Sequence, residues 1–122
     1  MPPLSPDALL PLKDLVFRIL VVLGTGERHG WGIARSLTDA GGERVLPGHL
    51  YRTLDSMLDL ALIDERDEPT DDTARPGARG AAPTRFFRLT AFGRKVAVAE
   101  TTRLEALITR SRAAGFAKAK AR

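Results

Sequence analysis

The chain of 122 residues contains no cysteine and only two histidines, His29 and His49. Without cysteine there are no disulfides, thiolate nucleophiles or zinc-thiolate sites, which excludes redox sensing and zinc-finger chemistry. Two histidines far apart in sequence make a poor metal site, and we expect neither a metal nor a cofactor. The longest apolar run, Ile19 to Leu23, is far too short to span a bilayer. The first twelve residues lack the features of a signal peptide, so we expect a cytoplasmic protein with no membrane association.

The residues that are present describe one globular domain. Hydrophobic residues make up 43% of the sequence and charged residues 28%, and the length is that of a single core. The formal net charge of +4 permits a polyanionic partner without requiring one. The sequence shows no nucleophile–base arrangement and no phosphate-binding glycine loop, and its carboxylates lie mostly in polar segments. We therefore do not expect an enzyme.

Apolar residues recur at helical spacing in four segments. Residues 12–23 predict a buried helix that ends at two glycines, and residues 29–42 predict a shorter second helix. Residues 46–63 predict a third, with Pro47 in its first turn and a polar face opposite an apolar one. Thr90 is a suitable N-cap for a long final helix that extends to residue 116.

Two short segments predict a β-hairpin. Residues 62–66 and 85–89 have strand composition, and residues 67–84, rich in Pro, Gly and Asp, predict a long hairpin tip. The first half of this tip is acidic, and its second half carries Arg75 and Arg79. Residues 1–11 contain four prolines and predict a flexible arm with a helix near 7–11, and residues 117–122 predict a frayed basic tail.

This order of elements is that of a winged helix-turn-helix domain. The fold class is therefore mainly α with a small β-hairpin, extended by a long C-terminal helix. In such domains the third helix enters the DNA major groove and the hairpin, or wing, touches the neighbouring backbone. We place the winged helix domain at residues 12–89, with its wing tip at 67–84, and the C-terminal helix at 90–116.

Four sequence blocks, in this order and spacing, resemble the PadR-like family of transcriptional regulators. They are HGWGIA at residues 29–34, PGHLYRTL at 47–54, MLDLALI at 57–63 and RFFRLTAFGR at 85–94. The resemblance implies a dimeric repressor with a winged helix reader and, as in the small subgroup, a single C-terminal dimerisation helix. His49 and Arg52 depart from the family pattern on the presumed reading face, so the resemblance does not imply an operator sequence.

The working hypothesis is a homodimer on a pseudo-palindromic operator in double-stranded DNA, with reading helices about 34 to 36 Å apart. The DNA-binding candidates lie on the third helix and the hairpin: Pro47, Gly48, His49, Tyr51, Arg52, Thr53, Ser56, Arg75, Arg79, Arg85 and Arg88. The dimerisation candidates are apolar: Leu12, Val16, Val96, Ala97, Leu104, Leu107 and Ile108. Regulators that resemble this family commonly respond to small, often aromatic compounds. Residue type alone suggests an effector pocket for a small hydrophobic compound at Phe17, Trp31, Phe92 and Leu104.

Other interpretations remain open at this stage. The stretch 46–63 is also compatible with an ordinary surface helix, and His29 and Trp31 with a helix-start histidine and a core tryptophan. The domain could also be a protein-interaction module, an adaptor or antitoxin-like protein whose acidic wing faces a protein partner. Such a module would show no salt-sensitive binding to duplex DNA from its upstream region.

Overall fold

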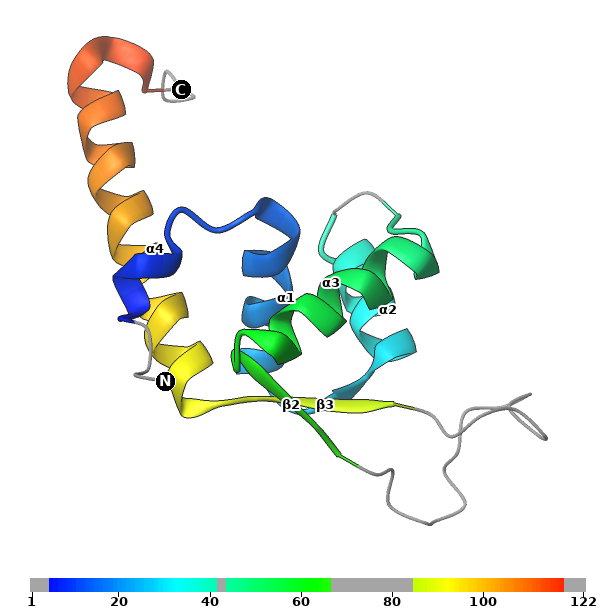
Figure 1. Cartoon of the computed structure of the whole chain (residues 1–122). Coiled ribbons are helices and arrows are strands. Elements are labelled where there is room, and N and C mark those ends of the chain that lie inside the picture. The colour runs from blue at the N-terminus through cyan, green and yellow to red at the C-terminus, as the bar shows by residue number, and fades with distance from the viewer. Residues whose placement is uncertain (1–4, 42–43, 67–84, 118–122) are drawn as a thin grey trace.

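Three helices form the body of the molecule (Figure 1). They are α1 (Asp14–Gly24), α2 (Gly30–Asp39) and α3 (Pro47–Asp59). The computed structural model describes residues 5–41, 44–66 and 85–117. All three helices predicted in this part of the sequence are confirmed, with ends that differ by one to four residues. The apolar period that predicted each helix also buries one side of it against the others.

A small antiparallel sheet lies against the helices. Its strands β1 (Arg28–His29), β2 (Ile63–Arg66) and β3 (Phe86–Leu89) are arranged in the order β1-β3-β2. Ile63 pairs with Leu89 in the predicted hairpin, which is confirmed. The first strand was not predicted, because two residues at the start of a helix are too few to show an alternating pattern.

The core forms where the three helices, the sheet and the C-terminal helix meet. α3 contributes Leu50, Leu54 and Met57, each at most 1% exposed, and this fixes which side of α3 faces outward. The other buried apolar residues are Ile19, Leu20, Leu23, Ile33, Leu37, Leu62, Ile63, Phe87 and Val96. The position of Val96 corrects an expectation. We assigned it to the dimer interface, but it is fully buried in the core of its own chain.

The C-terminal helix α4 (Ala91–Ser111) is anchored to the body by its first turn. The Thr90 hydroxyl accepts a hydrogen bond from the Gly93 N–H at 2.8 Å and lies 2.7 Å from the Ala61 carbonyl oxygen, to which it can donate. The predicted N-cap is thus confirmed. The second half of α4 projects away from the body (Figure 1) and ends in a π-helical turn, η2 (Arg112–Phe116). The predicted helix of residues 90–116 is therefore not α-helical throughout.

The N-terminal segment is packed more closely than expected. Residues 5–11 contain a 3-10 helix, η1 (Pro6–Leu9), which packs against α4. Leu9 and Leu10 lie against the core, and their apolar side chains explain why this segment folds back. The short helix expected near residues 7–11 is present as η1, at residues 6–9, and it packs on α4. Residues 1–4, and the predicted tail beyond Ala117, lie outside the described residues.

Candidate nucleic-acid interface

The exposed face of α3 carries polar residues that its packing does not require. Gly48, His49, Arg52 and Ser56 are all exposed, on the side opposite the buried leucines. Thr53 is half-buried, and its hydroxyl donates to the His49 carbonyl of the same helix at 2.9 Å. Thr53 is therefore less free to contact a partner than its four exposed neighbours.

Charge is distributed unevenly along this face. His49 and Arg52 lie in its N-terminal half, whereas the carboxylates Asp55 and Asp59 lie in its C-terminal half. A polyanion is therefore attracted to the first half of α3 and repelled from the second. Entry into a major groove by the N-terminal residues of the reading helix is the geometry of helix-turn-helix proteins.

The first turn of α3 adds main-chain donors to this region. Leu46 is the N-cap residue and provides no side-chain hydrogen bond, and Pro47 has no N–H to satisfy. No described side chain caps this end, so the N–H groups of Gly48 and His49 point along the helix axis. Such an end suits a phosphate, through the N–H groups and the helix dipole together.

Tyr51 is oriented differently from our expectation of a phosphate contact. It is half-buried, and its hydroxyl lies against Gly30, the first residue of α2, where a Cβ atom would overlap the ring. Gly30 thereby lets α2 and α3 approach closely. Because the hydroxyl faces the neighbouring helix, Tyr51 sets the contact between the two helices, and its hydroxyl does not face outward as a phosphate contact would require.

Arg85 also has a different position from the one expected. Its guanidinium bonds to Glu65 on β2 at 2.7 and 2.9 Å and to Asp55 on α3 at 2.7 Å. It also lies over the rings of Tyr51 and Phe87, at 5.6 and 5.2 Å from their centres. Two carboxylates occupy its donors, so Arg85 joins the base of the wing to α3 and is not a free phosphate contact.

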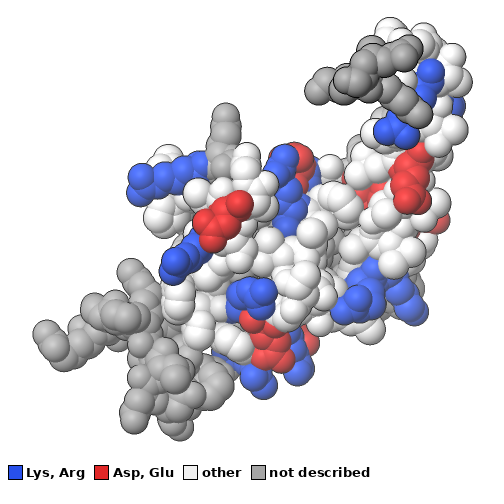
Figure 2. Space-filling model, turned by 180° about the vertical axis from the view of Figure 1, so that it is seen from behind, with Lys and Arg blue, Asp and Glu red and all other residues white. Residues whose placement is uncertain are grey.

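Arg88 is the candidate arginine on the strands of the wing. Arg88 on β3 is half-exposed and pairs with Asp64 at 3.5 Å, so it keeps more freedom than Arg85. Arg75 and Arg79, together with the acidic half of the wing tip, lie outside the described residues. On the side of the molecule seen in Figure 2, Lys and Arg are interspersed with Asp and Glu and do not form one continuous field.

The ion pair between Glu65 and Arg85 shifts the pKa of both side chains. The hydrogen bond from Arg85 is the main cause that lowers the pKa of the Glu65 carboxyl, against the opposing effect of burial. The bond to Glu65 in turn raises the pKa of the Arg85 guanidinium above its already high value. Both groups are therefore charged at neutral pH, and the pair stabilises the fold only while Glu65 is ionised.

Glu65→Gln is expected to cost about 1 kcal/mol of stability at pH 7, because both partners are partly exposed. The folded-state pKa of Glu65 is lowered, so this contribution is present above the unfolded value of about 4.3. It is lost as the pH falls through the folded value. The stabilities that urea denaturation gives for wild type and variant should therefore converge as the pH falls below the unfolded pKa of Glu65. A difference in stability that does not change with pH would contradict this role for the pair.

The candidate dimerisation residues divide by exposure. Leu107 and Ile108 on the projecting part of α4 are 45% and 49% exposed, and Phe116, which we did not predict, is 78% exposed. Leu12, Val16 and Ala97 are half-buried and pack against the core of the same chain. Leu104 is half-buried as well, and it lines a hollow together with Phe17. The most exposed of the predicted dimerisation residues therefore lie near the C-terminal end of α4.

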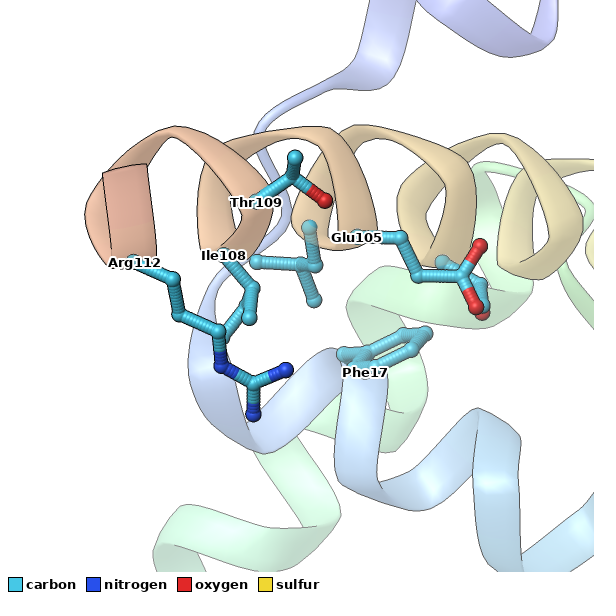
Figure 3. A pocket seen from close by; sticks show the side chains of 7 residues that line it. Phe17, Glu105, Ile108, Thr109 and Arg112 are labelled. Atoms are coloured by element: carbon cyan, nitrogen blue, oxygen red, sulfur yellow. The ribbon is translucent and has the colours of Figure 1, made fainter. Parts of the chain in front are cut away.

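The four effector-pocket candidates do not lie together. Phe17 and Leu104 line a hollow of about 420 Å³ between α1 and α4, with Thr101, Glu105, Ile108, Thr109 and Arg112. Figure 3 shows the Phe17 ring beneath α4, between the side chains of Glu105 and Arg112. Trp31 lies on α2 and stacks on His29 at 5.2 Å, and Phe92 packs against the core. The sequence-based hypothesis grouped Phe17, Trp31 and Phe92 by residue type, but the fold places them in different parts of the molecule.

Some residues that shape the interface were missed at the sequence level. Gly30, Asp55 and Glu65 fix the position of Tyr51 and Arg85, but none has a sequence signal for that role, because each acts on a residue far along the chain. His29 is the N-cap residue of α2, as the structural interpretation of this histidine expected.

Within the described residues, no group of three or more His, Asp or Glu side chains could hold a metal ion. No helix among them is long and apolar enough to cross a membrane.

The family model described as "Transcriptional regulator PadR-like family" matches residues 19–99, most of the described body and the first half of α4. No curated protein gives a significant match to the sequence.

Several solved structures have a similar fold. H. salinarum RosR is 25% identical, with 87% of this chain and 98% of that chain covered and a TM-score of 0.57. A PadR family transcription regulator from Clostridium difficile is 15% identical, with 82% and 96% covered and a TM-score of 0.70. A PadR-like transcriptional regulator from Bacillus cereus is 16% identical, with 85% and 93% covered and a TM-score of 0.67. At 15 and 16% identity, the last two support the fold alone.

Proposed function

Since the chain belongs to the PadR-like family of transcriptional regulators, we propose that it is a homodimeric repressor of a pseudo-palindromic operator in double-stranded DNA. The observation that carries this proposal is the outward face of α3. Three buried residues, Leu50, Leu54 and Met57, hold the helix on the body, and its exposed N-terminal half presents His49 and Arg52. A face that the core does not use, with an arginine, an imidazole and main-chain donors at one end, is suited to base edges and phosphates.

The projecting half of α4 supports the proposed dimer. Leu107, Ile108 and Phe116 are apolar and exposed on the C-terminal half of α4 and on η2. A second copy related by a two-fold axis would cover them. Two copies of α3 would then lie in successive major grooves, about 34 to 36 Å apart, and the symmetry of the operator would match that of the protein.

The experiment that tests the function is a gel shift with duplex DNA from upstream of the protein's own gene. We expect a retarded complex whose logarithmic affinity falls linearly with the logarithm of salt concentration, because phosphate contacts release counterions. A protein-interaction module would give no salt-sensitive shift with this or any other duplex. That result would overturn the proposal in favour of the alternative class.

We further propose that a small hydrophobic effector releases the repressor from its operator by binding in the hollow beside Phe17. The hollow lies between α1, which belongs to the reading body, and the part of α4 that we assign to dimer contacts. A compound wedged there would alter the angle between these two parts. Its apolar portion would lie on Phe17, Leu104 and Ile108, and polar groups at its edge would meet Glu105 or Arg112.

A thermal denaturation screen against hydrophobic compounds tests the effector. A true ligand at about 100 times its Kd stabilises the native state by about 2.7 kcal/mol. Phe17→Ala should abolish this stabilisation, whereas Val21→Ala, a truncation at an exposed position of the same helix outside the hollow, should retain it. Absence of stabilisation by every compound, or equal stabilisation of Phe17→Ala, would contradict the proposal.

A further inference from the structure

One carboxylate is buried where the fold has no evident need of it. Glu100 on α4 is 2% exposed and is the one charged residue buried to this degree among the described residues. Removing an ionised carboxylate from water is costly unless charged or hydrogen-bonding partners replace the water. Its neighbours one helical turn away, Val96 and Leu104, are apolar. The sequence therefore places a charge within a stripe that otherwise packs by hydrophobic contact.

Glu100 has such partners on two sides. The main-chain N–H of Leu12 donates to its Oε2 at 2.9 Å, and Arg103 donates to both carboxylate oxygens from the next turn of α4. The hydrogen bond from Arg103 is the main cause that lowers the pKa of the Glu100 carboxyl, with a further contribution from Leu12 and against the effect of burial. Glu100 is therefore held as a carboxylate anion with a fixed direction.

The hydrogen bond from Leu12 lies where the N-terminal part of the body meets α4. Leu12 belongs to the link between η1 and α1, and both of these elements pack against α4. α1 is part of the body that carries α3, whereas α4 continues past Glu100 to the exposed Leu107 and Ile108. The hydrogen bond from Leu12 to Glu100 thus joins the reading body to the helix that leads to the second copy.

A small change in the angle of α4 at Glu100 produces a larger displacement at the far end of the helix. The eleven residue steps from Glu100 to Ser111 span about 16 Å of helix, so a tilt of about 10° moves the far end by about 3 Å. One base-pair step of DNA is about 3.4 Å. A tilt of this size in each subunit would therefore displace the two reading helices by a distance comparable to a change of register on DNA.

We propose that Glu100 is a positioning residue that fixes the angle between α4 and the reading body, and thereby the separation of the two α3 helices in the dimer. This inference rests on the dimer of the proposed function. An apolar residue of similar size could be buried at a lower cost in desolvation free energy, but it would not fix the orientation of α4 relative to Leu12. A hydrogen bond to a main-chain N–H tolerates only a narrow range of angles, which a packed methyl group does not require.

The test uses the absence of cysteine from the chain. Asp59→Cys, at the exposed end of α3, gives one spin label per subunit, and pulsed electron resonance measures the distance between the two labels in the dimer. We expect one narrow distance peak for otherwise wild-type protein. Glu100→Leu should shift or broaden this distance peak by about 3 Å or more, because a tilt of α4 at Glu100 displaces the reading helices by about that distance. Glu100→Gln, which can still accept from Leu12 but lacks the charge, should have a smaller effect in the same direction.

Lys95→Gln is the matched control, because it removes a charge from an exposed position of the same helix and should leave the peak unchanged. If Glu100→Leu fails to fold by circular dichroism, Glu100→Gln decides the question. Wild-type peaks from every folded Glu100 variant would overturn the inference, while leaving the dimer intact. A wild-type protein that gives no distance between labels would be monomeric, which would overturn the proposed dimer and this inference with it.

DNA provides an independent readout. On operators whose half-site spacing is changed by one base pair, wild type should bind about tenfold more weakly. This is the size of the effect expected from one mismatched base pair. A folded Glu100 variant with the altered distance peak should lose most of this discrimination. An unchanged spacing preference in such a variant would show that the angle at Glu100 does not control the reading distance.

Discussion

Gly93→Ala is expected to lower the free energy of unfolding by about 3 kcal/mol, the upper part of the range for overfilled interiors. A Cβ at this position would overlap the Leu62 carbonyl oxygen and lie 2.9 Å from both the Leu62 carbonyl carbon and the Leu89 side chain. The Leu62 oxygen accepts the Thr90 N–H at 3.2 Å, so it cannot move without disturbing the start of α4. Urea denaturation measures the loss.

Gly24→Ala is the control for this prediction. Gly24 ends α1, and a Cβ there would meet no other atom within 4 Å. The variant should be as stable as wild type or up to about 1 kcal/mol more stable, because alanine restricts the unfolded chain. Equal effects of the two substitutions would contradict the close packing of α4 on Leu62. If the packing is as described, Gly93→Ala should also weaken DNA binding by releasing α4 from the body.

Arg52→Ala is expected to have the largest effect on DNA binding. Arg52 is exposed on the N-terminal half of α3, and the structure gives it no ion pair among the described residues. A base contact by arginine contributes about 1 to 3 kcal/mol, and its loss from both subunits should weaken operator binding by about thirtyfold or more. Fluorescence anisotropy with a labelled operator measures the change.

Arg94→Ala controls for net charge. Arg94 is exposed on the first turn of α4, and its substitution removes the same charge from a part of the molecule outside the proposed interface. We expect it to weaken binding by less than about threefold, since only long-range, salt-screened attraction is lost. If Arg94→Ala and Arg52→Ala weaken binding equally, with equal thermal stability, Arg52 makes no specific contact and α3 is not the reading element.

The fold was predictable because its signals are local. The helical period in residues 12–23 and 46–63, the hydroxyl of Thr90 at a helix start and the alternation in residues 85–89 each act within a few positions of the chain. β1 escaped prediction because two residues carry no pattern. Val96 was misassigned because the apolar stripe of α4 serves two surfaces: its first half faces its own core, and its second half is exposed.

The candidate site was less predictable, since side-chain roles depend on contacts between distant positions. Arg85 looked like a free basic residue until Asp55, thirty positions earlier, and Glu65 were found beside it. Tyr51 shares α3 with Arg52, yet one faces α2 and the other is exposed. Exposure of His49 and Arg52 did follow from the helical period, because residues opposite a buried stripe must face outward.

Selection of bound duplexes from a random pool, followed by sequencing, tests the central claim most directly. The claim is that two copies of α3 read DNA from a two-fold symmetric dimer. The enriched sequences should contain an inverted repeat whose half-site centres are about 10 to 10.5 base pairs apart, or a multiple of that spacing. Enrichment of a single unpaired site, or no enrichment above a mock selection, would contradict it.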